Sequence, residues 1–259
     1  MKKEKKTGFR RGIYILPNIF TSLNLFCGFY AIISSIDGKY IAASVAILIA
    51  VVFDTLDGKI ARTTNTTSRF GVEYDSLADL ISFGLAPGLM IYLWALKPFG
   101  RIGWLAAFLF ATCGALRLAR FNTQTGSISS DYFIGLPIPA GAGMAATTVL
   151  FFHKLGIVKN PHPVAILIML YALAFLMVSA IKYYSFKKKP ELFRKMNFNV
   201  LVTAILVLIF IAAQPSIALF FMGLAYIVSG PFSAIKRHKL VKKQKAETPK
   251  TEENHINPV

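Results

Sequence analysis

Two pairs of aspartates stand where two apolar segments of the chain meet. Asp54 and Asp57 are three residues apart near the end of one apolar segment, and Asp75 and Asp79 are four residues apart near the start of the next. Residues three or four apart lie on the same face of a helix. If both segments are helices joined by a short link, the four carboxylates converge between them, close to one end of each helix.

These carboxylates need compensating charge. Lys59 and Arg62 are the basic residues near the cluster on these two segments, too few for four acids that would otherwise repel one another. Charged side chains at membrane depth are costly unless they are paired or functional. The simplest compensation is divalent metal, and all-oxygen ligation favours Mg²⁺, Mn²⁺ or Ca²⁺ over zinc. An alternative is that the acids face water separately at helix ends, which the matched spacing of the two pairs disfavours.

The residues around the acids indicate a phosphorylated lipid. The small residues Gly58, Ala61 and Gly71 leave room for a ligand to approach the backbone. Arg62 carries a planar, forked donor that suits phosphate, and Ser68 adds a hydroxyl. Clustered divalent metals offset the charge of a pyrophosphate and stabilise a displacement at phosphorus. The sequence therefore predicts phosphoryl-group chemistry beside a hydrophobic cleft.

The segments that carry these residues belong to an all-α, polytopic membrane bundle. Hydrophobic residues make up 55% of the 259 residues, and long apolar stretches recur along the whole chain. We expect about eight transmembrane helices, separated by turn-forming Gly and Pro positions. They fall at about residues 13–36, 40–62, 72–96, 101–121, 138–157, 163–186, 198–213 and 215–235. A basic segment at residues 1–12 precedes this membrane domain, residues 13–236, and a polar tail at residues 237–259, expected to be disordered, follows it.

The basic residues are divided unequally between the two ends of the expected helices. The chain has 29 Lys and Arg against 12 Asp and Glu, a net charge of +17. With the N-terminus in the cytoplasm, 24 of the 29 fall on the cytoplasmic side and five on the other side. We therefore expect both termini and the acid cluster at the cytoplasmic face of the cell membrane, in contact with membrane lipids. Because topology accounts for the charge, we expect no nucleic-acid binding.

The spacing of the acid segment resembles the signature of the CDP-alcohol phosphatidyltransferase family. The segment runs Asp54-x2-Asp57-Gly58-x2-Ala61-Arg62-x8-Gly71-x3-Asp75-x3-Asp79, eight defined positions across 26 residues, without a departure from the family pattern. The resemblance covers most of residues 13–235. It implies transfer of a phosphatidyl group from a CDP-linked lipid to an alcohol, with release of CMP, by an enzyme that is usually a homodimer.

The resemblance also implies roles for individual residues. Asp54, Asp57 and Asp75 would ligate metal. Asp79 would complete a site for two divalent ions, Mg²⁺ or Mn²⁺ with Ca²⁺ as a further candidate, and would act as general base on the acceptor hydroxyl. The CDP moiety of CDP-diacylglycerol would be bound by Gly58, Ala61, Arg62, Ser68 and Gly71.

Three polar residues in the first helix, Asn18, Thr21 and Asn24, are more polar than lipid-facing positions allow. We expect Asn18 and Thr21 to line the nucleotide or metal site, with Asn24 as a further candidate. The alternative is that these side chains cap a helix or make hydrogen bonds between helices.

Within the family, three stretches resemble the membrane-embedded phosphatidylserine synthases, which implies L-serine as the acceptor. They are LPNIFTSLNLFCGFYA at residues 16–31, ALRLARFNTQ at residues 115–124 and FIGLPIPAGAG at residues 133–143. Serine brings a carboxylate and an ammonium, so its pocket needs cationic donors and polar acceptors. Arg117, Arg120 and Asn122 are the candidates, with Arg120 as a clamp on the carboxylate. For both arginines the alternative is a charge that sets topology.

Three alternatives stay open at this point. The first is an enzyme of the same family with another acceptor, namely glycerol 3-phosphate, inositol phosphate or choline, or with a donor lipid that has ether-linked chains. An ion transporter is disfavoured, because transporter sites lie near the bilayer midplane at helix breaks in repeated halves. Here the acids lie at the ends of unbroken apolar patterns. A lipid-binding scaffold without catalysis would not need an aspartate at the position of Asp79.

Overall fold

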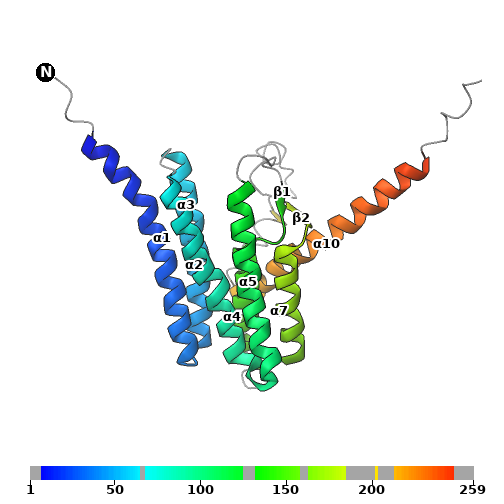
Figure 1. Cartoon of the computed structure of the whole chain (residues 1–259). Helices are drawn as coiled ribbons and strands as arrows, with labels where there is room; N and C mark the ends of the chain where they lie inside the picture. Colours follow the sequence, from blue (N-terminus) through cyan, green and yellow to red (C-terminus); the bar gives the residue numbers. More distant parts are fainter. Residues whose placement is uncertain are drawn as a thin grey trace, which may run out of the picture.

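The computed structural model describes residues 7–64, 68–124, 132–157, 163–184, 202–203 and 213–247. In this part of the chain, long helices run side by side, and the start of α1 and the far end of α10 point toward the same end of the molecule (Figure 1). The longer helices are α1 (Thr7–Ile36), α2 (Tyr40–Thr63), α3 (Arg69–Asp79), α5 (Arg101–Gln124), α6 (Ile138–Lys154), α7 (Pro163–Val178) and α10 (Pro215–Glu247).

A tight turn joins α1 and α2 into an antiparallel pair. Gly38 has a φ of 74°, a left-handed conformation that glycine adopts without strain. The backbone N–H of Lys39 donates to the carbonyl of Ser34 at 2.8 Å, which satisfies a carbonyl at the end of α1. The turn places the end of α2, which carries Asp54 and Asp57, beside the first half of α1.

The third apolar segment is one continuous rod with two π-helical stretches. After α3 come η1 (Leu80–Leu85), α4 (Ala86–Ile91), η2 (Tyr92–Leu96) and the short 3₁₀ turn η3 (Lys97–Phe99). In η1 the N–H of Ala86 donates to the carbonyl of Ile81, five residues earlier. This wider turn lies just before Pro87, whose ring would press on the carbonyl of Phe83 in a regular helix. The rod thus changes its winding directly after Asp79.

The centre of the described bundle is α6, in which buried positions run from Ile138 to Val149. Its sequence, IPAGAGMAATTV, consists mainly of small residues, which lets the neighbouring helices approach closely. At Gly141 the helix packs directly against the side chains of Met177 and Phe110. The outer helices instead expose large apolar side chains, including Phe26, as a lipid-facing surface requires.

The structure contains two short strands, one of which replaces the end of an expected helix. The strands β1 (Tyr132–Ile134) and β2 (Lys182–Tyr184) pair antiparallel, with Phe133 opposite Tyr183. The helix expected over residues 163–186 therefore ends at Val178, and the chain continues in an extended conformation. In the C-terminal segment, α10 continues to Glu247, beyond the expected end at residue 235.

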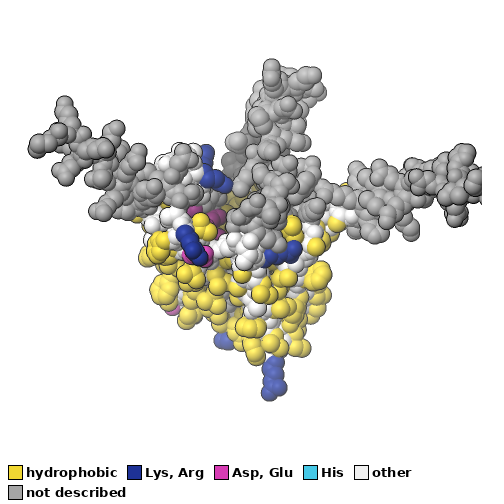
Figure 2. Space-filling view, turned by 45° about the horizontal axis from the view of Figure 1, so that its top comes forward, with side chains coloured by type: hydrophobic (Ala, Val, Ile, Leu, Met, Phe, Trp, Pro, Cys, Tyr) yellow, Lys and Arg dark blue, Asp and Glu magenta, His cyan; other side chains and the backbone are white. Residues whose placement is uncertain are grey.

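Among the described residues, five helical segments are long and apolar enough to cross a membrane. Hydrophobic side chains cover much of the described surface in the view of Figure 2. The five are Leu16–Ile36, Tyr40–Thr63, Arg69–Phe99, Arg101–Thr123 and Pro215–Ala234. The shorter apolar α7 and the 17-residue α6 lie among them. The protein is therefore a helical, multi-pass membrane bundle. The expected count of eight helices is not confirmed, because residues 198–213 lie almost wholly outside the described residues.

Candidate active site

A cavity of about 200 Å³ lies where α1, the end of α2 and the start of α3 meet. Because pockets that enclose a whole ligand of moderate size are typically about 300–1,000 Å³, this one fits part of a nucleotide, such as its diphosphate. Acidic side chains, with Lys or Arg close by, show at the edge of the hydrophobic surface in Figure 2. The cavity is lined by Pro17, Asn18, Thr21, Asp57, Gly58, Ala61, Arg62, Ser68, Gly71, Val72 and Asp75.

Three of the four aspartates converge beside this cavity. One carboxylate oxygen from each of Asp54, Asp57 and Asp75 lies within 4.8 Å of the others. Asp57 is buried, and Asp54 and Asp75 are partly buried. The two helix faces that the sequence pairs indicated therefore do meet, and both α2 and α3 pack against α1.

Asp57 is held by the first helix. The hydroxyl of Thr21 donates to Asp57 Oδ2 at 2.9 Å and also lies 3.1 Å from the backbone carbonyl of Pro17. Thr21 itself is 3% exposed, so little water competes for this hydrogen bond. Thr21 lines the cavity as expected, and its hydroxyl orients a carboxylate of the acid cluster.

Asp79 is buried, lies outside the group of three and has its own partner on α1. The side-chain amide of Asn24 donates from Nδ2 to Asp79 Oδ1 at 2.9 Å. The hydroxyl of Ser82, in η1, donates to the backbone carbonyl of Asn24 at 3.0 Å. Gly28 lies directly against Ser82, where a Cβ atom would overlap the serine Cα and Oγ. The missing side chain thus lets α1 and η1 touch, and this contact fixes Asn24 relative to Asp79.

The start of α3 is shaped by Ser68, its N-cap residue. Ser68 Oγ accepts a hydrogen bond from the Gly71 N–H at 3.0 Å, which satisfies one of the free donors of the first turn. A Cβ at Gly71 would lie 3.1 Å from Ser68 Oγ and 3.5 Å from Asn18 Oδ1, so glycine keeps this corner open. Both Ser68 and Asn18 line the cavity, and the Ser68 hydroxyl keeps its own proton for a ligand.

The three candidates for acceptor binding lie in different surroundings on α5. Arg117 points inward: its guanidinium interacts electrostatically with Asp79 and Asp54, and its Nε is buried without a hydrogen-bond partner. Arg120 is exposed. Asn122 donates from Nδ2 to the hydroxyl of Ser76 at 2.9 Å, which ties α5 to α3. Of the three, Arg117 is therefore the residue that faces the acids.

Two residues at the site were not among the principal candidates. Asn24 is a further candidate beside Asn18 and Thr21, and its position three residues after Thr21 places it on the same face of α1. Ser82 gave no signal, because a lone serine in an apolar helix is common. Its importance depends on the packing of η1 against Gly28, which the sequence pattern does not encode.

The donor set fits a hard divalent cation. All three grouped ligands are carboxylates, which suits Mg²⁺, Mn²⁺ or Ca²⁺. Asp75 Oδ1 is buried and has no hydrogen-bond partner, an arrangement that costs free energy unless a ligand binds there. Asp79 lies outside the group of three but interacts electrostatically with Asp54 and Asp75.

Comparison with known proteins agrees with this geometry. Residues 14–179 match the model of the CDP-alcohol phosphatidyltransferase family. A CDP-diacylglycerol–serine O-phosphatidyltransferase of Helicobacter pylori is 39% identical over 219 residues, which cover 84% of this chain and 90% of that protein. An archaetidylserine synthase of Methanothermobacter thermautotrophicus is 40% identical over 185 residues, 71% of this chain and 73% of that protein.

A third relative is similar over most of its own length. The CDP-diacylglycerol–serine O-phosphatidyltransferase of Bacillus subtilis is 37% identical over 173 residues, which cover 67% of this chain and 92% of that protein. The family match includes the cavity, the four aspartates and Arg117. The chain belongs to the CDP-alcohol phosphatidyltransferase family.

Proposed function

We propose that this protein is a phosphatidylserine synthase, which transfers the phosphatidyl group of CDP-diacylglycerol to the hydroxyl of L-serine and releases CMP. The observation that carries the proposal is the convergence of Asp54, Asp57 and Asp75 within 4.8 Å beside a cavity at a helix junction. Family membership and the names of three relatives, all of which are serine transferases or make a serine lipid, support the acceptor.

The donor lipid binds at the cavity in this proposal. Arg62 supplies cationic donors to the diphosphate, and the Ser68 hydroxyl adds a neutral one. The absence of side chains at Gly58 and Gly71 admits the ligand to the helix backbones. Ala61, Asn18 and Thr21 line the same cavity and complete its wall. The acyl chains lie in the surrounding bilayer.

The proposed metal ligands are Asp54, Asp57, Asp75 and Asp79, holding two divalent ions of the Mg²⁺ or Mn²⁺ type, with Ca²⁺ as a further candidate. Bound there, the ions would neutralise the diphosphate and the charge that develops on departing CMP. Thr21 keeps Asp57 turned toward this site, and Asn24 does the same for Asp79.

Asp79 is the proposed general base. It accepts the proton of the serine hydroxyl as the hydroxyl oxygen forms a bond to the lipid-side phosphorus. The bond between that phosphorus and the oxygen of the CMP phosphate breaks, and CMP leaves with the electron pair. Arg117 holds the serine carboxylate, since its guanidinium faces Asp79. Arg120 and Asn122 act at the entrance to this pocket, near the end of α5.

The proposed topology puts both termini and the active site in the cytoplasm, with eight membrane-crossing helices in the domain of residues 13–236. The distribution of basic residues supports this orientation, as does the common direction of the start of α1 and the end of α10 (Figure 1). Cysteines introduced at Thr64 and at Lys97, on opposite sides in this proposal, should react with an impermeant thiol reagent from opposite faces of intact vesicles.

The homodimer implied by the family resemblance stays a prediction. It is checked by light scattering of the purified protein in detergent, with the detergent contribution subtracted. A dimer requires twice the mass of the 259-residue chain, and the mass of a single chain would contradict it.

The first test of the function is CMP release by the purified protein with CDP-diacylglycerol and Mg²⁺ or Mn²⁺. L-serine, glycerol 3-phosphate, inositol phosphate and choline are supplied separately. We expect release with serine, loss of release with a chelator, and loss in an Asp79→Asn variant. Release with another acceptor alone would overturn serine while keeping the family chemistry. No metal-dependent release with any acceptor would favour a transporter or a lipid-binding scaffold.

The donor lipid is tested in the same assay. The similarity to an archaetidylserine synthase favours a second candidate donor, a CDP-activated lipid with ether-linked chains. Parallel measurements of kcat/KM with ester- and ether-linked CDP lipids decide between them. We expect the ester lipid to be used at least as well as the ether lipid, and a strong preference for the ether lipid would overturn the diacyl assignment.

A further inference from the structure

Three buried side-chain polar atoms among the described residues have no hydrogen-bond partner: Asn24 Oδ1, Asp75 Oδ1 and Arg117 Nε. All three belong to the surroundings of the acid cluster. A buried polar atom without a partner is unfavourable, and in native proteins it calls for a specific explanation such as a ligand. The proposed metal explains the oxygen of Asp75. Asn24 Oδ1 is a hydrogen-bond acceptor and Arg117 Nε is a donor. A metal ion cannot satisfy both atoms, because it does not accept a hydrogen bond from an N–H group.

The orientation of Asn24 follows from its partner. An ionised carboxylate only accepts hydrogen bonds, so the group that faces Asp79 Oδ1 at 2.9 Å is the NH₂ of the amide. The amide oxygen is therefore turned away from Asp79 Oδ1 but remains on the same planar group. Asn24 is fully buried, and Ser82 holds its backbone carbonyl at 3.0 Å. The oxygen is consequently fixed in place beside the proposed base.

Arg117 supplies the complementary group. Its guanidinium, with the free Nε–H, interacts electrostatically with Asp79 from α5, whereas Asn24 reaches Asp79 from α1. A hydroxyl compound that approaches Asp79 thus meets a neutral oxygen acceptor and a cationic donor. An amino acid carries the matching pair, an ammonium that donates hydrogen bonds and a carboxylate that accepts them.

We propose that Asn24 is a substrate-binding residue whose Oδ1 accepts a hydrogen bond from the ammonium of the amino-acid acceptor, while Arg117 holds the carboxylate. This inference rests on the proposed function and names the group that recognises the amino end of serine. With both ends of the zwitterion held, the side-chain hydroxyl is presented to Asp79. Asn24 thereby links recognition and proton transfer, because its other atom, Nδ2, orients Asp79 itself.

The inference separates serine from an analogue that lacks only the ammonium. 3-Hydroxypropanoate has the carboxylate and the hydroxyl of serine, so it binds through Arg117 without using Asn24 Oδ1. In an Asn24→Ala variant we expect the KM for serine to rise about tenfold to a hundredfold, the loss of a hydrogen bond to a charged group. The inhibition constant of 3-hydroxypropanoate against serine should stay within about twofold of wild type.

The experiment uses the full chain with CDP-diacylglycerol and Mn²⁺, and measures incorporation of labelled L-serine into lipid, beside CMP release, for wild type, Asn24→Ala, Ser82→Ala and Ser35→Ala. Ser82→Ala loosens Asn24 without removing it and should shift the serine KM in the same direction by a smaller factor. Ser35 is a buried polar residue of the same helix whose hydroxyl donates to the Ala31 carbonyl. Ser35→Ala is the matched control and should leave both constants unchanged.

The outcomes are distinct. A rise in the serine KM with an unchanged inhibition constant supports the inference. A fall in kcat alone, with both constants unchanged, would show that Asn24 only orients Asp79 and would overturn it. Equal rises in both constants would indicate a distorted site and would also overturn it. If wild type releases no CMP with serine, the proposed function fails and the inference fails with it.

Discussion

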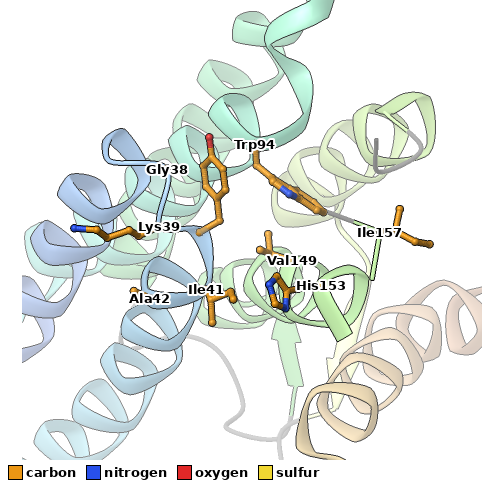
Figure 3. Close-up of a pocket in the computed structure, with 9 residues that line it drawn as sticks. Gly38, Lys39, Ile41, Ala42, Trp94, Val149, His153 and Ile157 are labelled. Atoms are coloured by element: carbon orange, nitrogen blue, oxygen red, sulfur yellow. The ribbon is translucent and has the colours of Figure 1, made fainter. Parts of the chain in front are cut away.

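The α1–α2 pair carries a cavity at each of its ends. The proposed active site lies at the smaller of the two cavities. The cavity at the acid end is about 200 Å³, whereas the one at the opposite end is about 470 Å³. The larger cavity lies between the α1–α2 turn, η2 and the end of α6 (Figure 3). It is lined by Gly38, Lys39, Tyr40, Ile41, Ala42, Trp94, Val149, His153 and Ile157.

The polar groups at the two ends of the α1–α2 pair differ in whether they are already paired. In the larger cavity Lys39 extends away from the space (Figure 3), and its Nζ pairs with Asp37 at 3.1 Å. The hydroxyl of Tyr40 donates to the Leu93 carbonyl at 3.2 Å. At the acid end, by contrast, polar atoms of Asp75, Asn24 and Arg117 are buried and unpartnered. Buried polar atoms without partners, rather than cavity volume, distinguish the end at which we propose that substrate binds.

The largest expected effect comes from removing the base at the acid end. Asp79→Asn should lower kcat for CMP release with serine by roughly 10²–10⁴-fold, the usual contribution of general base catalysis. The amide keeps the size of the side chain but cannot take the proton. The matched control is Asp37→Asn, which removes a carboxylate from the opposite end of the same helix pair. We expect the control to retain full activity, and equal losses in both variants would remove the distinction between the two ends.

A smaller effect is expected from Thr21, which lines the cavity and orients a carboxylate of the acid cluster. Thr21→Val removes the hydroxyl that donates to Asp57 and leaves the shape of the side chain almost unchanged. Such supporting hydrogen bonds are typically worth about 10–100-fold in metal affinity or activity. We expect the Mn²⁺ concentration for half-maximal CMP release to rise about tenfold or more.

The control for Thr21 is another buried threonine on a membrane helix. The Thr147 hydroxyl of α6 bonds to the carbonyls of Gly143 and Met144 in its own helix. Thr147→Val should therefore leave the Mn²⁺ dependence unchanged. An unchanged Mn²⁺ dependence in Thr21→Val would contradict the role of Thr21 in holding a metal ligand.

Much of the acid site could be predicted from the sequence because its spacing is helical. Asp54 and Asp57 share one face of α2, and α2 ends at Thr63, one residue from the expected end. The α1–α2 turn and the start of α5 at Arg101 also fall where Gly and Pro stop a helix. Local chemistry determines these features, so a single sequence is sufficient to predict them.

The features that the sequence did not predict depend on contacts between distant segments. The apolar pattern predicts one regular helix over residues 72–96, although Pro87 lies within it, whereas the structure has a π-helical turn after Asp79. The strand pairing of residues 132–134 with 182–184 joins segments on either side of α6 and α7. The tyrosines and isoleucine near residue 182 fit an apolar helix as well as a strand, so periodicity alone extended that helix too far.

Arg120 and Arg117 show the same limit within one helix. Both lie three residues apart on α5, and the sequence favoured Arg120 as the carboxylate clamp. In the structure Arg120 is exposed, whereas Arg117 faces Asp79 and Asp54. Which of the two points inward depends on the rotation of α5 in the bundle, and that rotation is set by packing against α7 and η1.

A modest effect is expected at Ser68, where capping and ligand binding can be separated. Ser68→Ala removes the N-cap of α3, a loss of about 1 kcal/mol in stability, and also removes a donor to the diphosphate. Ser68→Asp keeps the cap but places a negative charge at the cavity. The midpoint temperature of thermal unfolding should therefore be lower in Ser68→Ala than in wild type and nearly unchanged in Ser68→Asp. The KM for CDP-diacylglycerol should rise a few-fold in Ser68→Ala and further in Ser68→Asp. A normal KM in Ser68→Asp would indicate that Ser68 acts only as a cap.

The smallest effect is expected at the larger cavity, and it is the sharpest check on the comparison of the two ends. His153 lines this cavity, lies in the last turn of α6 and is exposed. Because it is separated from the aspartates by the length of the α1–α2 pair, His153→Ala should leave kcat and both KM values within about twofold of wild type. Stability should also change little, since surface substitutions usually alter it by less than about 0.5 kcal/mol. A tenfold loss of CMP release would mean that the two ends are coupled. The pairing of its polar groups would then not show that the larger cavity takes no part in the reaction.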